Sequence, residues 1–434
     1  MTSELTDFAP YLTPSLGARP GRRVEVGEAL AAIKSGQRLL VGQACGAPLG
    51  LFEAMVAERE RWDELELLFG IQLAHLPVVD YPNDPFRFTT LQPNPFLKPA
   101  SEAGAVTPLT ARITDVPRLF TPNGSQPVDA VLIQVSPPGP EGLFSMGTSV
   151  GVMIDAVRSA PLVIAQVNES MPYTFGVGEL RRDEIDLLVE IDGPLVELVR
   201  ATAGPVEEQV ADHVAGIVPD GATLQFGIGA VPEAISARLS EQRNLGVHSG
   251  MISDGIIEMV EAGALSGAAK SMDKGVIITG ELMGTRRLFD WAHRNPLVRT
   301  APPAYTHGGS VLERCHRFTA INSAIEVGLD GSVNGESIGG RLVSGPGGQP
   351  DFAEGALRCP GGMSVLALPS TAAKGKVSRI VRRISGEAAI TVPRHQVDRI
   401  VTEYGVASLY GQTLPQRAEA LRAVAHPNFR EDLA

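Results

Sequence analysis

Residues 224–263 read LQFGIGAVPEAISARLSEQRNLGVHSGMISDGIIEMVEAG, and this stretch decides the expected fold. Leu224–Phe226 is expected to end a buried strand and Gly227–Gly229 to form a tight turn. Val231–Glu233 is expected to open a helix, because a proline is tolerated in the first helical turn. The apolar Leu245–Val247 then repeats the change from strand to loop. The stretch therefore predicts two strands whose following loops meet at one edge of a sheet.

The same pattern continues on both sides of this stretch. Short apolar runs predict further buried strands at Gln37–Val41, Leu65–Leu73, Ala130–Val135, Pro161–Asn168 and Ile321–Val327. Helical segments alternate with these runs, which is typical of an open, mostly parallel α/β sheet. A Gly204-Pro205 break separates two halves of similar style. We therefore expect one α/β domain over residues 1–204 and a second over residues 205–434, facing each other across a ligand cleft.

Three smaller features depart from this regular alternation. The proline-rich segment Val79–Val106 is too long for a simple connection and is expected to be irregular, as lids and oligomer contacts often are. Lys374–Arg383 holds five basic residues and no acidic one, which predicts either a solvated edge strand or a contact for phosphate groups. Cys45 follows the first strand without a nearby histidine or acidic partner, so we expect a small buried residue rather than a nucleophile.

Composition and charge exclude several functional classes. The 434 residues include 37 basic and 49 acidic side chains, and the net charge of −12 argues against non-specific binding of nucleic acid. The sequence has no basic leader and no apolar stretch of membrane-spanning length, so we expect a cytoplasmic protein without a membrane partner. The three cysteines lack CxxC spacing and the eight histidines lack ligand spacing, so no metal is expected.

Two stretches carry a resemblance to a known family. Residues 224–263 and Ile321–Ala356, INSAIEVGLDGSVNGESIGGRLVSGPGGQPDFAEGA, resemble the acetyl-CoA hydrolase and 4-hydroxybutyrate CoA-transferase family, and the resemblance extends along nearly the whole chain. It implies two α/β domains of CoA-transferase type, the second carrying the active-site loops, and a homodimer. It also implies an acyl-CoA transferase or hydrolase that uses coenzyme A or an acyl-CoA as substrate together with a small-molecule acceptor.

The chain departs from this family at the residue that carries the chemistry. Enzymes of the family exchange CoA between acids through a glutamate, which forms first an anhydride and then a glutamyl-CoA thioester. In the family this glutamate stands in a His-Thr/Ser-Glu-Met sequence, whereas the same loop here reads His248-Ser249-Gly250-Met251. Because glycine has no side chain with which to attack, the ordinary reaction through a glutamyl-CoA thioester is not expected.

Four interpretations of this departure are open. In the first, which we favour, the acyl group passes directly from CoA to a second substrate or to water, with His248 either as general base or as a packing residue. In the second, Glu326 or Glu281 replaces the lost carboxylate. In the third, the chain is a non-catalytic acyl-CoA-binding protein. In the fourth, the glycine is an engineered replacement of the glutamate in an ordinary CoA-transferase.

The resemblance also implies which residues form the site. Carried over position by position, the contacts of CoA or the acyl group are Gly227, Ile228, Gly229, Ala230, Val231, Ser344, Gly347, Gly348 and Lys376. The residues expected to take part in catalysis are His248, Ser249, Gly250 and Glu326. Backbone N–H groups of the glycine-rich turns are expected to hold the thioester or to stabilise its oxyanion.

Overall fold

The computed structural model describes residues 6–434. These residues form two compact units, each built around its own large sheet. The N-terminal unit comprises Asp7–Val199 and Ile278–Tyr305, and the C-terminal unit comprises Arg200–Ile277 and Thr306–Ala434. Residues 278–305 thus group with the first unit, whereas the sequence-based division after residue 204 assigns them to the second half. That division into two domains stays a prediction.

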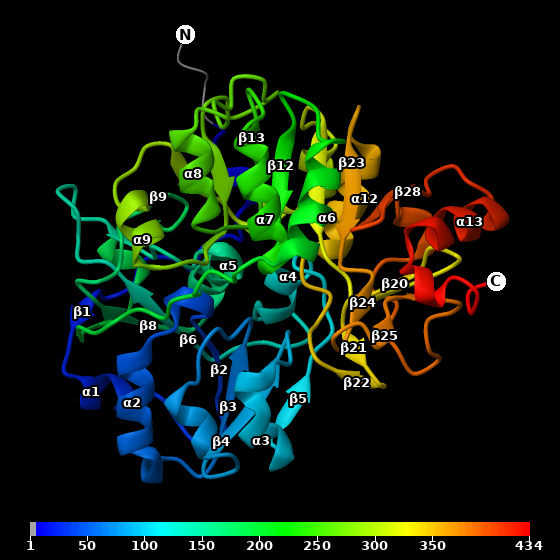
Figure 1. Ribbon diagram of the computed structural model, residues 1–434. Helices are drawn as coiled ribbons and strands as arrows, with labels where there is room; N and C mark the ends of the chain where they lie inside the picture. The colour runs from blue at the N-terminus through cyan, green and yellow to red at the C-terminus, as the bar shows by residue number, and fades with distance from the viewer. Residues whose placement is uncertain (1–5) are drawn as a thin grey trace. The chain divides into compact units, whose positions relative to one another are not determined.

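The large sheet of the N-terminal unit, within residues 6–434, contains eight parallel strands (Figure 1). In spatial order they are β1 (Arg22–Arg23), β11 (Leu187–Glu190), β8 (Leu162–Val167), β6 (Ala130–Val135), β2 (Arg38–Val41), β3 (Leu65–Phe69), β4 (Phe86–Thr90) and β5 (Val106–Pro108). Leu39 and Leu67 enter one hydrophobic cluster, whereas the adjacent Leu40 and Leu68 enter another. Both faces are therefore covered, which is why these strands read as continuous apolar runs.

The helices of this unit cover the two faces of its sheet. Helix α2 (Leu49–Ala57) joins β2 to β3 and packs in the cluster of Leu39, whereas α5 (Gly151–Ser159) joins β6 to β8 and packs in the cluster of Leu40. The other elements of the unit are α1 (Val26–Ala31), α3 (Lys98–Glu102), α4 (Val116–Phe120), α9 (Arg286–Ala292), β7 (Phe144–Ser145), β9 (Phe175–Gly176), β10 (Glu179–Leu180), β16 (Glu281–Leu282) and β17 (Val298–Thr300). The predicted α/β alternation is confirmed here.

The segment Val79–Val106 is more regular than its sequence predicts. It contains β4 and the short helix α3 and leads into β5, and β4 and β5 extend the parallel sheet to its edge. The prediction of an irregular excursion was wrong because the prolines lie in turns and at helix starts, outside the strand Phe86–Thr90. Cys45 is buried, as expected.

The large sheet of the C-terminal unit runs, within the described residues, in the order β13-β12-β18-β23-β27-β28. The strands are β13 (Gly246–Val247), β12 (Thr223–Phe226), β18 (Phe318–Asn322), β23 (Met363–Ala367), β27 (Arg399–Thr402) and β28 (Gly405–Ser408). All neighbours are parallel except β27 and β28, which form an antiparallel hairpin. The strand, turn and helix unit predicted at residues 224–239 is confirmed by β12 and α7 (Ala230–Leu239).

Smaller elements surround this sheet. They are α6 (Pro205–Ala215), α8 (Gly255–Glu261), α11 (Gly309–Leu312), α12 (Gln349–Arg358), α13 (Leu414–Val424), β14 (Met251–Ile252), β19 (Glu326–Gly328), β20 (Val333–Asn334), β21 (Ser337–Ile338), β22 (Arg341–Leu342), β24 (Thr371–Ala372), β25 (Val377–Ser378) and β26 (Ile380–Val381). A single strand over Ile321–Val327 was a wrong prediction: β18 ends at Asn322, and Glu326 begins β19, which pairs with β20 and β26 in a separate small sheet.

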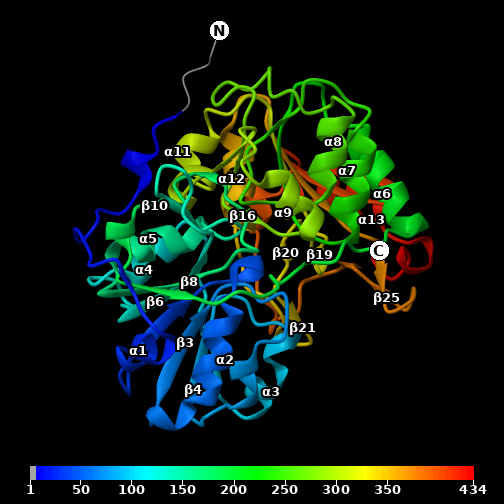
Figure 2. The same ribbon diagram turned by 90° about the vertical axis from the view of Figure 1, so that its left-hand side faces the viewer.

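The strand order of this sheet reverses between β12 and β18. From β12 the chain passes through α7 to β13 on one side, and from β18 it passes through α12 to β23 on the other. Right-handed crossovers then place α7 and α12 on opposite faces of the sheet. Figure 2 shows α6, α7 and α8 side by side, with α12 apart from them. In open α/β sheets such a reversal leaves a crevice at the carboxyl ends of the two strands, where ligands bind.

Candidate active site

The glycine turn after β12 lies at this point of reversal. Gly227 N–H donates a hydrogen bond to the carbonyl oxygen of Ile321 on β18, with an N···O distance of 3.1 Å. Gly229 has a φ of +117°, a conformation that favours glycine, and α7 begins at the next residue. A Cβ atom added at Gly229 would meet nothing within 4 Å. The turn therefore leaves open space beside Gly229 at the start of α7, and the first N–H groups of a helix suit an anionic or carbonyl ligand.

The ends of β12 and β18 are also tied together by two amide side chains. Asn322 Nδ2 donates to Gln225 Oε1 at 2.9 Å, and Gln225 Nε2 donates to Asn322 Oδ1 at 3.3 Å. Gln225 is buried, so this reciprocal pair satisfies polar groups that would otherwise be costly. The pair fixes the spacing of the two strand ends at the point of reversal.

The loop after β13 begins with two buried side chains. His248 has no exposed surface, and its ring lies edge-on to Phe318 with 6.5 Å between the ring centroids. Ser249 is equally buried, and its Oγ donates to the carbonyl oxygen of Met251 at 2.7 Å. Both side chains hold the loop in place. Their catalytic roles stay predictions, and their location favours a positioning role.

The third residue of this loop, Gly250, packs against a histidine that sequence reasoning did not single out. A Cβ atom added at Gly250 would lie 2.6 Å from Cε1 and 2.7 Å from Nε2 of His307. A Cβ atom added at Gly348 would lie 2.5 Å from Cδ2 and from Nε2 of the same ring. The imidazole of His307 thus fits between two glycines, and it occupies the volume in which any side chain at position 250 would have to begin.

Two further contacts hold the His307 ring. Nδ1 lies 2.8 Å from the hydroxyl of Thr306, and the ring packs on Phe352 with 4.3 Å between centroids and 32° between planes. Only 7% of the His307 surface is exposed. The pKa of His307 is lowered to about 3, mainly by burial and to a smaller extent by the charge of the neighbouring His248. The imidazole is therefore neutral at physiological pH. No sequence signal pointed to this residue, because its partners come from segments distant along the chain.

The remaining residues carried over from the family lie on several elements of the C-terminal unit. Gly348 immediately precedes α12, and Gly347 before it has a φ of +56°. Ser344 is half-buried and its Oγ donates to the carbonyl oxygen of Gly345 at 3.3 Å. Lys376 is exposed between β24 and β25. Glu326 Oε1 accepts a hydrogen bond from Asn334 Nδ2 at 3.0 Å. These contacts place the residues but do not test their roles.

Glu281, the other carboxylate considered as a substitute, lies in the N-terminal unit. It is 5% exposed, and its Oε1 accepts a hydrogen bond from Gln43 Nε2 at 2.9 Å. Burial raises the pKa of Glu281 to about 8, so the carboxyl group is protonated at neutral pH. A neutral carboxylic acid is a much poorer nucleophile than the carboxylate ion.

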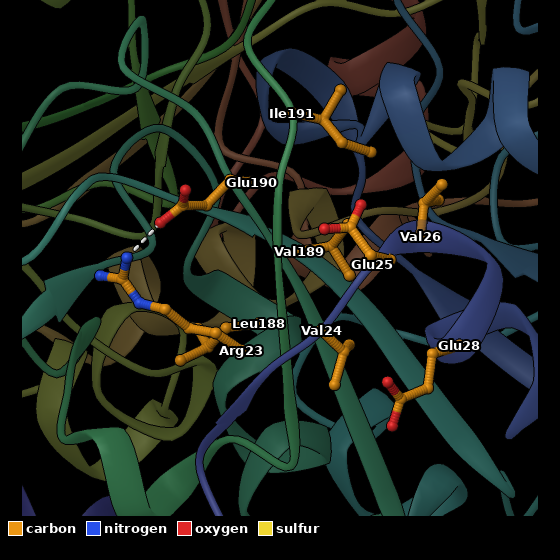
Figure 3. Close-up of a pocket in the computed structure, with 9 residues that line it drawn as sticks. All are labelled: Arg23, Val24, Glu25, Val26, Glu28, Leu188, Val189, Glu190 and Ile191. Carbon is orange, nitrogen blue, oxygen red and sulfur yellow. Dashed lines mark hydrogen bonds and ion pairs between the residues drawn. The ribbon is translucent and has the colours of Figure 1, made fainter.

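A surface pocket in the N-terminal unit has the wrong charge for an anionic substrate. Figure 3 shows its lining, formed by Arg23, Val24, Glu25, Val26, Glu28, Leu188, Val189, Glu190 and Ile191. The single arginine of the lining forms an ion pair with Glu190, and Glu28 forms one with the neighbouring Arg22, so the lining offers no unpaired arginine to an anion. Coenzyme A carries several phosphate charges, so this pocket does not suit it.

The comparisons with known proteins identify the family. A model of the acetyl-CoA hydrolase/transferase N-terminal domain matches residues 21–197, and a model of the corresponding C-terminal domain matches residues 284–434. The chain is 40% identical to 4-hydroxybutyrate coenzyme A transferase of Clostridium kluyveri over 413 residues, which cover 94% of this chain and 95% of that protein. The chain belongs to the acetyl-CoA hydrolase/transferase family. This confirms the resemblance, and the chain is an acyl-CoA transferase or hydrolase.

A further relative and two solved structures agree with the fold. Succinyl-CoA:cyclohexane-1-carboxylate CoA transferase of Geobacter metallireducens is 32% identical, over 94% of this chain and 92% of its own. The crystal structure of RipA from Yersinia pestis has a TM-score of 0.90 and 29% identity, covering 95% of this chain and 96% of its own. That of 4-hydroxybutyrate CoA-transferase from Porphyromonas gingivalis has a TM-score of 0.81 and 33% identity with the same coverage. The predicted CoA-transferase type of α/β fold is confirmed.

Two further findings concern the environment of the chain. Across residues 6–434, no helix has the length and apolar character needed to cross a membrane. In the same range, no cluster of three or more histidine, cysteine or acidic side chains is arranged to hold a metal ion. The cytoplasmic location stays a prediction.

Proposed function

We propose that this enzyme transfers the acyl group of a CoA thioester directly to an acceptor or to water, without an enzyme-bound glutamyl-CoA thioester. The observation that carries the proposal is the packing at Gly250. This position has no carboxylate, and the space where its side chain would begin is filled by the ring of His307. A nucleophile that attacks the thioester must therefore come from the second substrate.

The glycine turn after β12 is the proposed seat of the thioester. Gly227, Ile228, Gly229, Ala230 and Val231 lie at the point where strand order reverses, next to the start of α7. Backbone N–H groups there are suited to stabilise the oxyanion that forms when the carbonyl carbon is attacked.

Further contacts to CoA are proposed from the second glycine cluster and the basic segment. Gly347 and Gly348 at the start of α12, together with Ser344, supply small residues and backbone N–H groups. The exposed Lys376 is proposed to bind a phosphate group of CoA. The net charge of the protein is −12, which would otherwise repel this anionic substrate. Following the family resemblance, we also propose a homodimer, which light scattering of the purified protein would test.

A substitute carboxylate is less favoured by the contacts of the two candidates. Glu281 is protonated at neutral pH for the reason given above. Glu326 is occupied by its hydrogen bond from Asn334, which orients it within the small sheet of β19 and β20. Neither observation supports a free carboxylate nucleophile.

Release of free thiol from a panel of acyl-CoAs tests the proposal. The wild-type enzyme should release CoA, faster with the correct hydroxyl or amine acceptor, and acylated acceptor or free acid should appear in equal amount. Peptide mass spectrometry after incubation with acyl-CoA should find no adduct on a glutamate. A glutamyl-CoA thioester on Glu326 or Glu281, or transfer of CoA to added acetate, would overturn direct transfer.

A further inference from the structure

We infer that His307 is the catalytic base of this reaction, and that its Nε2 atom takes the proton from the hydroxyl, amine or water molecule that attacks the thioester. The inference rests on the proposed direct transfer. It names the class of acceptor, which must carry a proton on its attacking atom, and so excludes a carboxylate as acceptor.

The position of Nε2 relative to the glycines carries the inference. Nε2 is the His307 atom that lies near the Cβ positions of both glycines, at 2.7 Å for position 250 and 2.5 Å for position 348, whereas Cε1 and Cδ2 each approach only one of them. In the family, a glutamate at position 250 would extend from the first of these points. The Nε2 edge of the imidazole therefore lies where the first atoms of a side chain at position 250 would be.

The length of a glutamate side chain beyond Cβ is comparable with the reach of one bound acceptor. The carboxylate oxygens of a glutamate lie three bonds beyond its Cβ atom, whereas a hydrogen bond from a hydroxyl or amine to Nε2 spans about 2.8 Å. An acceptor bound to Nε2 would thus place its attacking atom beside position 250, where the family has its nucleophile. The same thioester position then serves both kinds of reaction, with an external nucleophile in place of an internal one.

The hydrogen bond at the other side of the ring is compatible with the required tautomer. When Nδ1–H donates to the hydroxyl of Thr306 at 2.8 Å, the lone pair of the neutral imidazole is on Nε2. The acceptor atom forms its bond to the carbonyl carbon while Nε2 takes its proton. The carbon–sulfur bond then breaks, and the CoA thiolate leaves with the proton returned from Nε2. The products are the acylated acceptor and CoA-SH, and His307 is regenerated.

The surroundings of the two histidines distinguish their roles. His248 has no exposed surface and packs edge-on to Phe318, so it cannot touch an acceptor in this structure. His307 keeps 7% exposure and lies beside Gly250 itself. Its low pKa makes it a weak base, so we expect a contribution near the lower end of general-base catalysis, about 100-fold in kcat.

Two isosteric substitutions test this role. In His307→Asn the amide can still meet Thr306 in place of Nδ1, but nothing replaces Nε2. In His307→Gln the amide nitrogen reaches toward the Nε2 position as a hydrogen-bond donor, without basicity. Both variants should lose about 100-fold in kcat for thiol release with KM for acyl-CoA changed little. Exposed His395→Gln, elsewhere in the C-terminal unit, is the matched control and should keep wild-type kinetics.

Chemical rescue separates a base from a packing residue. His307→Gly leaves a ring-sized space between two glycines, and added imidazole should restore thiol release in proportion to its unprotonated fraction. Wild-type rates in His307→Gln, or no rescue in a His307→Gly variant that still binds CoA, would overturn the base role while leaving direct transfer in place.

Two measurements on the wild-type enzyme keep the inference testable if the variants do not fold. Single-turnover acyl transfer should slow in D₂O, because a proton moves in the chemical step, and an equal rate in both solvents would overturn the role of His307. If the wild type releases no thiol with any acceptor, the proposed function fails and the inference fails with it.

Discussion

The contact between Gly250 and His307 predicts a specific steric cost for the smallest possible substitution. Gly250→Ala adds one Cβ atom 2.6 Å from Cε1 and 2.7 Å from Nε2 of His307, closer than such atoms approach in proteins. The backbone at Gly250 does not have a positive φ, so alanine itself is tolerated there. The cost must therefore come from moving the ring.

The ring has little room in which to move. It is held by Gly348 on one side, by Phe352 beneath and by Thr306 at Nδ1. Forcing an extra carbon into such a packed site costs about 1–3 kcal/mol. In a His307→Ala background the same alanine keeps only an ordinary contact with Cζ of Phe352, at 3.5 Å, and should be neutral or slightly stabilising, because it restricts the unfolded chain. A double-mutant cycle should thus give a coupling of at least about 1 kcal/mol.

The assay is urea denaturation followed by circular dichroism. Tryptophan fluorescence is unsuitable for the C-terminal unit, because Trp62 and Trp291 both belong to the N-terminal unit. Gly386→Ala is the matched control, since a Cβ atom there meets nothing within 4 Å. Equal stability of Gly250→Ala and wild type, or an equal cost of Gly250→Ala in both backgrounds, would refute this description of the site.

Three other predictions follow from the same contacts. Gly229→Ala should weaken acyl-CoA binding measured by calorimetry and destabilise the fold by about 1–2 kcal/mol, because its φ of +117° strains any residue with a Cβ atom. For His307, a folded-state pKa of about 3 means that the unfolded state binds the proton first as pH falls below 6.5. Wild type should therefore lose about 2 kcal/mol more than His307→Asn between pH 7 and pH 5 in urea titrations, and parallel losses would contradict the neutral imidazole. Glu281 has the opposite sign, because its pKa of about 8 makes the folded state hold a proton that the unfolded state releases above pH 4.5. Stability should fall from pH 5 to pH 8 in wild type and fall less in Glu281→Gln, and an unchanged difference would show that Glu281 is ionised when folded.

Local patterns predicted the parts of the fold that depend on neighbours in the chain. The strand and helix on either side of Gly227–Gly229 follow from apolar runs separated by a turn, and β12 and α7 confirm them. The segment Val79–Val106 was predicted wrongly, because its prolines concealed the strand Phe86–Thr90 between two turns. Proline marks where a strand cannot lie, but it does not show how soon the next one begins.

The sequence singled out Gly250 but not His307, the residue that packs against it. The family resemblance predicts a carboxylate where this chain has Gly250, but the packing around that glycine could not be predicted. His307 lies 57 positions further along the chain, outside the stretches that carry the resemblance. A buried imidazole set between two glycines has no periodicity, so only the packed structure brings these residues together.

The seat of the ring between Gly250 and Gly348 bears on which side chains these two positions can accept over time. A Cβ atom at either position would begin within 2.7 Å of the ring of His307. A change from glycine to a larger residue at position 250 or 348 must therefore be accompanied by movement or replacement of that ring. The three positions are sterically coupled, so the residue at one of them restricts those that the other two can accept.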